Sequence, residues 1–90
     1  MYSCVKISDK DNVATVTKTI CKGETVIYKF KGDEFKVTAV SDIPIYHKMA
    51  LSDIEKGGIV IKYGCKIGYA LEDIKAGGHV HTHNLFSSMD

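Results

Sequence analysis

Three seven-residue stretches, ICKGETV (20–26), IEKGGIV (54–60) and IKAGGHV (74–80), share the pattern Ile-x-x-Gly-x-x-Val. In each of them the isoleucine can enter the core before a bend, and the glycine supplies a positive φ without steric cost. The valine then begins an extended segment, because β-branched residues favour strands. The spacing between the three stretches is unequal, which argues against a solenoid of stacked repeats. The pattern predicts a small fold built from recurring corners.

Strand signals dominate between these corners. TVIYKF (25–30) and EFKVTAV (34–40) are β-branched and aromatic runs, and Gly32-Asp33 between them predicts a two-residue type II′ hairpin turn. Further short strands are expected in IVIKYG (59–64), KIGYA (66–70) and HVHTHNL (79–85). The best helix candidate is DNVATVTKTI, residues 11–20. The predicted fold class is therefore mainly β: one domain, residues 1–90, of short irregular strands with at most one short helix.

Two aspartates precede the second and third corners in the related sequences LSDI and LEDI. Asp and Asn side chains commonly accept hydrogen bonds from backbone N–H groups of nearby turns. Asp53 and Asp73 are therefore predicted to cap these turns.

Composition excludes several classes of partner. The chain of 90 residues has 12 Lys and Arg against 11 Asp and Glu, mixed along its length, so neither nucleic acid nor an anionic membrane is an expected partner. Three cysteines without a CxxC pair, and no apolar signal or membrane-spanning run, predict a cytoplasmic protein. A chain of this size buries only a modest core, so an elaborate catalytic cavity would have to be shared with another chain.

Three of the four histidines alternate along the stretch GGHVHTHNLF (77–86). If residues 79–85 are extended, His79, His81 and His83 lie on one face of a strand. Adjacent imidazoles of this row can then converge on one metal ion, whereas His79 and His83 are about 13 Å apart and cannot easily share it. A solvated face is an equally good interpretation of this spacing alone. A lone His-Lys pair such as His47 and Lys48 lies more often on the surface than in a functional site.

The stretch HKMALSDIEKGGIVIKYGCKIGYALEDIKAGGHVHTHNL (47–85) resembles the motif run of a SAF-type domain. That domain opens the altronate and galactarate dehydratases and forms the small subunit of sulfolactate sulfo-lyase. DNVAT (11–15) is also similar to the N-terminal stretch of this family. One departure is Tyr46, which stands where the family has a glycine before His-Lys.

The resemblance implies a β-clip fold, a folded-over arrangement of short strands, and a set of site residues. It favours His81 and His83 as metal ligands and His47, Lys48 and Asn84 as substrate-binding residues, whereas His79 lies outside the shared motif. The implied cofactor is a divalent metal, Fe²⁺ first and Mn²⁺ or Zn²⁺ as alternatives, acting as a Lewis acid toward a hydroxy acid. Asn84 has a second possible role, to orient a ligand histidine. No general base is identified, so the catalytic residues are unknown at this stage.

The expected function is that of a small subunit, or detached N-terminal domain, of a metal-dependent hydroxy-acid lyase. A larger catalytic subunit would be its partner, and a sugar acid or sulfolactate its substrate. The alternative is an autonomous SAF-like sugar-binding or interaction module without catalysis. A third is a structural β domain with exposed histidines. The sequence does not separate altronate, galactarate and sulfolactate as substrates.

Overall fold

The chain folds into nine short strands in the computed structural model, which describes residues 2–87. The strands are β1 (Cys4–Val5), β2 (Val13–Val16), β3 (Thr25–Phe30), β4 (Asp33–Thr38), β5 (Lys48–Ala50), β6 (Ile59–Lys62), β7 (Cys65–Ala70), β8 (His79–Val80) and β9 (Leu85–Ser87). The mainly β fold class is confirmed, and residues 2–87 contain no helix. The helix expected over residues 11–20 is wrong, because residues 13–16 form strand β2. The β-branched Val and Thr side chains of this segment favour a strand, and three of its four residues are buried.

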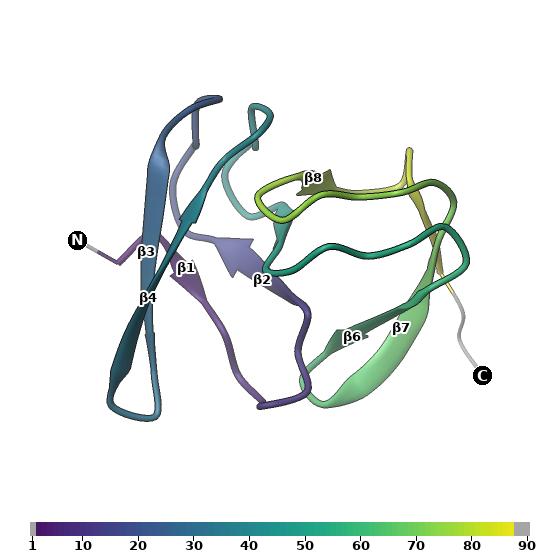
Figure 1. Ribbon diagram of the computed structural model, residues 1–90, viewed down its shortest axis with the longest axis horizontal. Helices are drawn as coiled ribbons and strands as arrows, with labels where there is room; N and C mark the ends of the chain where they lie inside the picture. Colours follow the sequence, from purple (N-terminus) through teal and green to yellow (C-terminus); the bar gives the residue numbers. More distant parts are fainter. Residues whose placement is uncertain (1, 88–90) are drawn as a thin grey trace.

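The strands form three antiparallel sheets. One has the order β1-β2-β5-β8, the second is the hairpin β3-β4, and the third has the order β6-β7-β9. Figure 1 shows the β3-β4 hairpin on one side of the molecule and β6 and β7 on the other, with β2 between them. Two buried clusters follow this division, one containing Ile20, Ile43 and Met49 and the other containing Ile54, Ile74 and Val80. No helix in the described part of the chain has the length and hydropathy needed to span a bilayer.

The three predicted corners are present, and the structure adds a fourth. Gly23, Gly57 and Gly77 have φ between 83° and 91°, as the repeated pattern predicted. The fourth corner begins at Ile43 and ends at Tyr46, whose φ is 70°. The sequence analysis missed it because a tyrosine occupies the position that glycine holds in the other three.

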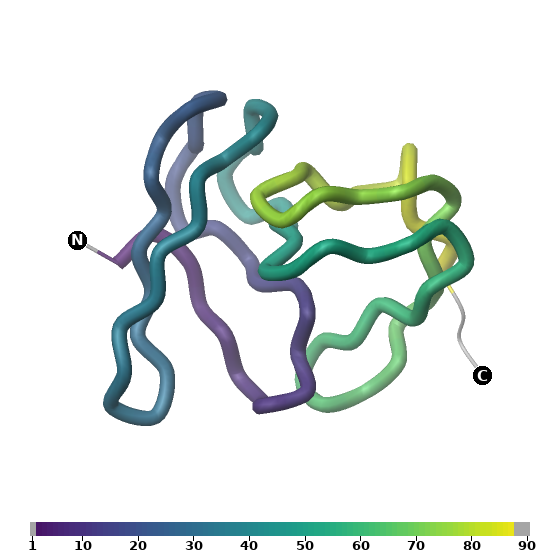
Figure 2. Tube along the Cα trace, viewed as in Figure 1, coloured from purple at the N-terminus to yellow at the C-terminus, as the bar shows by residue number. Residues whose placement is uncertain are grey.

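The four corners form two reciprocal pairs, which we call the first turn pair (residues 16–24 with 39–47) and the second turn pair (residues 50–58 with 70–78). In the second pair, Gly57 N donates to Ala70 O and Gly77 N donates to Ala50 O, at 2.8 Å each. The first pair has the equivalent bonds, from Gly23 N to Ala39 O and from Tyr46 N to Val16 O. Bridges link Ile20 with Ile43 and Ile54 with Ile74. Figure 2 shows the two segments of the second pair running side by side.

The aspartates before the corners cap the partner corner, not their own. Asp53 Oδ1 accepts a hydrogen bond from Ala76 N, and Asp73 Oδ1 accepts one from Lys56 N, both at 2.8 Å. The prediction that these residues cap turns is confirmed, with the caps exchanged between the two segments. In the first pair only Asp42 has this role, toward Lys22 N.

The β3-β4 hairpin was predicted at the right place with the wrong turn. The loop residues are Lys31 and Gly32, with φ of 51° and 84°. Positive φ at both loop residues is the signature of a type I′ turn. Asp33 begins β4 instead of occupying the turn.

Candidate metal centre

Three histidines from two segments come together at one edge of the four-stranded sheet. The antiparallel register of β5 and β8 pairs Met49 with His79 and Lys48 with Val80. Continuing this register places His47, just before β5, opposite His81, just after β8. Directly opposite residues on an antiparallel pair are close neighbours, and the rings of His47 and His81 stack with centroids 3.9 Å apart.

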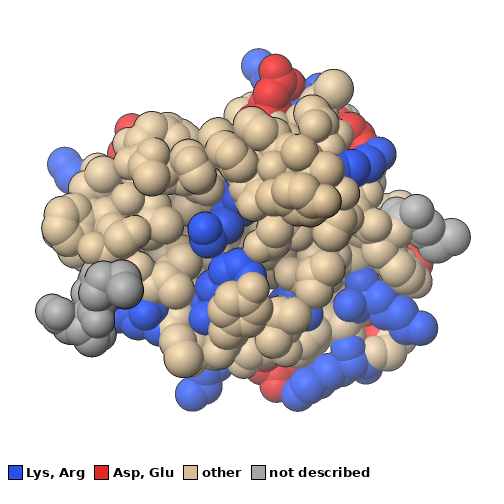
Figure 3. All heavy atoms as spheres, turned by 180° about the vertical axis from the view of Figure 1, so that it is seen from behind, with Lys and Arg blue, Asp and Glu red and all other residues tan. Residues whose placement is uncertain are grey.

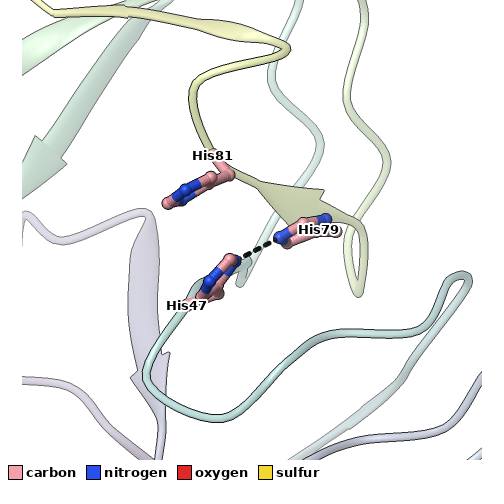
Figure 4. A group of neighbouring side chains, drawn as sticks. All are labelled: His47, His79 and His81. Carbon is pink, nitrogen blue, oxygen red and sulfur yellow. Dashed lines mark hydrogen bonds between the residues drawn. The ribbon is translucent and has the colours of Figure 1, made fainter.

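The nitrogen atoms of this group are close enough to share one ligand. One ring nitrogen from each of His47, His79 and His81 lies within 4.8 Å of the other two. His47 Nδ1 and His79 Nε2 are 2.9 Å apart, and Figure 4 shows these two rings meeting edge to edge with His81 beside them. Two nitrogens bound tetrahedrally to one ion at 2.0–2.1 Å are about 3.4 Å apart. The three half-buried imidazoles are therefore close enough to share a transition metal such as Zn²⁺ or Fe²⁺ once the stacked rings turn their nitrogens toward it.

Asn84 fixes the main chain of two of these histidines. Its Nδ2 donates to His79 O at 2.8 Å, and its Oδ1 accepts from His81 N at 3.0 Å. The side chain is buried, so this pair of bonds is formed away from competing water. The sequence analysis gave Asn84 two roles, binding a substrate hydroxyl or orienting a histidine, and its contacts here are those of the second.

His83 lies outside the group of mutually close nitrogens. The extended segment expected over residues 79–85 is wrong, because β8 ends at Val80 and residues 81–84 form a bend closed by Leu85 N donating to His81 O. As a result the His79 and His83 rings, expected about 13 Å apart, have centroids at 4.9 Å. His83 is exposed and packs against the outer side of His79.

The environment of His79 and His81 favours their neutral form. Burial first, and then the neighbouring imidazoles, lower the pKa of His79 below the ordinary value for histidine. Burial, the ring of His47 and then the ammonium of Lys48 lower the pKa of His81 in the same direction. Neutral imidazole is the metal-binding form, because a protonated ring has no free lone pair.

Tyr46 and Lys48 flank His47 on either side. Tyr46 N donates to Val16 O, and Val16 N donates to His47 O, both at 2.9 Å. These bonds fix the main chain of His47 immediately after the strained φ of Tyr46. Lys48 is half-buried on β5, and its positive charge contributes to lowering the pKa of His81. The residues expected from the resemblance to bind substrate, His47, Lys48 and Asn84, thus lie in one neighbourhood.

A pocket of about 300 Å³ opens beside the cluster. His79 and His83 form part of its wall, together with Ser41, whose Oγ accepts a hydrogen bond from His79 N at 3.0 Å. Lys75 contributes a cation to the same wall, and Glu72 and Asp73 contribute carboxylates. The pocket gives a small polar molecule access to the cluster from this side.

His79 is the residue whose place in the group the sequence analysis missed. The shared motif His-x-His-Asn begins two residues later, so the resemblance gave His79 no role. The one signal for it was the spacing between His79 and His81, and that spacing becomes informative only once β8 is paired with β5 in the observed register.

Comparison with known proteins identifies relatives of the whole chain. The family model described as the altronate/galactarate dehydratase SAF domain matches residues 2–88. Altronate dehydratase of Escherichia coli (strain K12) is 49% identical over 85 residues, which are 94% of this chain and 16% of that protein. Altronate dehydratase of Bacillus subtilis (strain 168) is 37% identical over 99% of this chain and 17% of its own length.

A second kind of relative is a short subunit. The (2R)-sulfolactate sulfo-lyase subunit alpha of Paracoccus pantotrophus is 53% identical over 51 residues, which are 57% of this chain and 76% of that subunit. This chain therefore spans only a small part of the dehydratases that it matches but most of the length of that subunit. The chain belongs to the family of SAF domains of the altronate and galactarate dehydratases.

Proposed function

We propose that this chain is the SAF component of a metal-dependent hydroxy-acid lyase whose active site is completed by a larger catalytic chain. The observation that carries the proposal is the three-histidine cluster, found in a domain whose relatives are named as dehydratases and a sulfo-lyase subunit. The larger chain is either a separate subunit or the remainder of the same polypeptide. The substrate is a hydroxylated acid of the altronate, galactarate or sulfolactate type.

In this proposal His47, His79 and His81 hold a divalent metal, Fe²⁺ first, with Mn²⁺ or Zn²⁺ as alternatives. The set keeps His81 from the pair that the resemblance implied and takes His47 and His79 in place of His83. What supports it is the mutual distance of the three nitrogens and the lowered pKa of two of the rings. A bound divalent ion supplies Lewis acidity toward the oxygens of a hydroxy acid.

The residues of this chain have three separate roles in the proposal. The three histidines provide ring nitrogens within 4.8 Å of one another, while Asn84 fixes the main chain of His79 and His81. Lys48, next to the cluster, attracts an anionic group of the acid. No carboxylate of residues 2–87 joins the three nitrogens, although Glu72 and Asp73 line the neighbouring pocket. The proposal assigns the general base to the larger chain.

The test is reconstitution with the larger lyase chain of the same organism. We expect elimination from altronate, galactarate or sulfolactate by the metal-loaded complex and none by this chain alone. The substitution His81→Ala is expected to abolish turnover by the complex, whereas Lys36→Ala on the distant β3-β4 hairpin leaves it intact. Turnover by the isolated domain would contradict the proposal. Failure to form a complex with the larger chain, together with binding of neutral sugars by the isolated domain, would favour the autonomous binding module.

A further inference from the structure

Outside the histidine cluster, one lysine side chain is buried without an acidic partner. Lys62, the last residue of β6, is 7% exposed. The ion pairs among the described residues join Lys18 with Glu24 and Lys31 with Asp9, so no carboxylate of residues 2–87 lies within 4.0 Å of Lys62 Nζ. No buried side-chain nitrogen among the described residues lacks a hydrogen-bond partner, so the Lys62 ammonium keeps contact with solvent while its stem is buried. An anion from outside the described chain can therefore reach it.

Tyr63 covers one side of this ammonium. Lys62 Nζ lies 3.6 Å from the centroid of the Tyr63 ring, a close cation–π contact. The ring covers only one side of the ammonium, so the other N–H groups of Lys62 remain free to donate hydrogen bonds to another molecule. The phenol itself is exposed and can donate a hydrogen bond to the same ligand.

The turn that presents Lys62 and Tyr63 is clamped by a distant part of the chain. Tyr63 and Gly64 form a two-residue turn between β6 and β7, with φ of 58° and 72°. Asp11 Oδ1 accepts a hydrogen bond from Gly64 N at 2.8 Å. Asn12 Oδ1 accepts one from Ile61 N at 2.8 Å. The DNVAT stretch noted in the sequence thus holds a strained tyrosine turn in place, and such strain persists only where surrounding contacts impose it.

The carboxylate of Asp11 already accepts hydrogen bonds from backbone N–H groups. Its oxygens accept N–H groups of Ile7, Ser8 and Gly64. Burial works against the charged form, but these backbone hydrogen bonds outweigh it and hold the pKa of Asp11 below the ordinary value. The carboxylate therefore stabilises the turn and does not pair with Lys62.

Lys48 supplies a second cation next to the histidines, since it follows His47 and pairs with Val80 of β8. The Lys62 ammonium first, and Lys48 as a smaller contribution, lower the pKa of the Tyr63 phenol, and Lys48 also reaches His81. Lys48 forms no ion pair with any described carboxylate. All 12 basic residues of the chain are lysines, and Figure 3 shows lysine atoms gathered in a hollow near the middle of one face.

We propose that Lys62, Lys48 and the phenol of Tyr63 form a binding site for a carboxylate or sulfonate group of a small acid. The site is separate from the histidine cluster and adjoins it through Lys48. Its identification as an anion site rests on the buried lysine and the clamped turn, whereas the choice of a hydroxy acid as the ligand rests on the proposed function. In that setting the site holds an acid group of the substrate beside the metal centre.

The test is binding of altronate and galactarate to the isolated chain in the presence of a chelator, followed by NMR shifts of residues 61–64. We expect saturable shifts with both acids and none with galactitol, the uncharged analogue of galactarate. Lys62→Met keeps the apolar stem and removes the charge, so it should weaken binding about tenfold, as loss of one charge-assisted hydrogen bond does. Lys62→Arg should retain binding, which shows that the fold of the variant is not at fault. Lys31→Met, in the equivalent turn of the other hairpin, is the matched control and should bind as the wild type does.

Equal binding by Lys62→Met and the wild type would overturn the proposal, as would equal shifts with galactitol. Absence of saturable shifts at about 10 mM acid, above the Kd of about 1 mM of a weak site, would overturn it as well. If Lys62→Met instead prevents assembly with the larger chain while acid binding is unchanged, the anion is a carboxylate of that chain and the small-acid site is rejected. Because the assay contains neither metal nor the larger chain, its failure is distinguishable from failure of the lyase proposal, which turnover by the complex decides.

Discussion

The two turn pairs share one backbone design but differ in how easily their residues adopt it. In the second pair, glycine occupies both left-handed positions, and Asp53 and Asp73 cap both turns. In the first pair a single aspartate acts as a cap, and Tyr46 takes a positive φ. Non-glycine residues adopt this conformation at a cost of about 1–2 kcal/mol. The less favourable pair is the one that leads directly into His47 and Lys48, so strain is concentrated beside the candidate site.

The largest expected effect is at Gly77, where the two pairs meet. Val40 N donates to Gly77 O, and a Cβ at Gly77 would lie 2.0 Å from Thr38 O. Gly57 has the same φ within a few degrees, but a Cβ there meets nothing within 4 Å. We therefore expect Gly77→Ala to lower the free energy of unfolding by more than about 3 kcal/mol and Gly57→Ala by only about 1 kcal/mol. Urea unfolding measures both, and equal losses would show that the contact between the pairs is not tight.

The next effect is loss of an exchanged cap. Asp73→Ala leaves Lys56 N without its acceptor, so we expect a loss of about 1 kcal/mol in the free energy of unfolding, as for other side-chain caps. Asp33, an exposed residue at the start of β4, provides a matched control, and Asp33→Ala should change stability by less than about 0.5 kcal/mol. If the two variants lose the same amount, the caps do not stabilise the turn pairs.

The strain at Tyr46 predicts a smaller change of opposite sign. Tyr46→Gly relieves the positive φ, but it also adds conformational freedom to the unfolded chain. The side chain is 72% exposed, so little packing is lost. We expect a net gain of about 0.5 kcal/mol in the free energy of unfolding. Thermal denaturation of this variant beside Tyr63→Gly, at the clamped turn, measures it, and a clear loss at Tyr46 would show that the tyrosine is not strained.

The histidines predict a modest dependence of stability on pH. Their folded-state pKa values are lowered for His79 and His81, so below about pH 6.5 the unfolded chain binds protons more readily than the folded one. Stability contributed by the neutral rings is therefore present above that pH and is lost as the pH falls. Urea midpoints at pH 7.5 and pH 5.5 with a chelator present should differ less in His79→Asn than in the wild type. An unchanged difference would mean that His79 titrates normally.

Local pattern was enough to predict the β class and three of the four corners, because Ile, Gly and Val act there through local conformational preference. The fourth corner was hidden because tertiary hydrogen bonds of Tyr46, and not its own preference, impose the left-handed conformation. Tertiary contacts also explain why the helix expected over residues 11–20 is wrong, because burial and pairing with β5 favour a strand there.

Most residues of the candidate site were predicted from the sequence, but their spatial arrangement was not. His47, Lys48, His81 and Asn84 do lie in one neighbourhood, whereas the membership of His79 depends on the register between two strands about 30 residues apart in sequence. His83 leaves the predicted row because Asn84 closes a bend at the end of β8. Alternation along a strand is informative only while the strand continues, and here it ends after two residues.

The most direct test of the account is titration of the chain with Co²⁺ or Zn²⁺ at neutral pH. It compares the wild type with single alanine substitutions at His47, His79, His81 and His83. We predict that the first three substitutions each weaken binding by at least about tenfold, and that His83→Ala stays within about twofold of the wild type. The converse result, with affinity unchanged by His47→Ala and His79→Ala but lost in His83→Ala, would contradict the three-histidine centre.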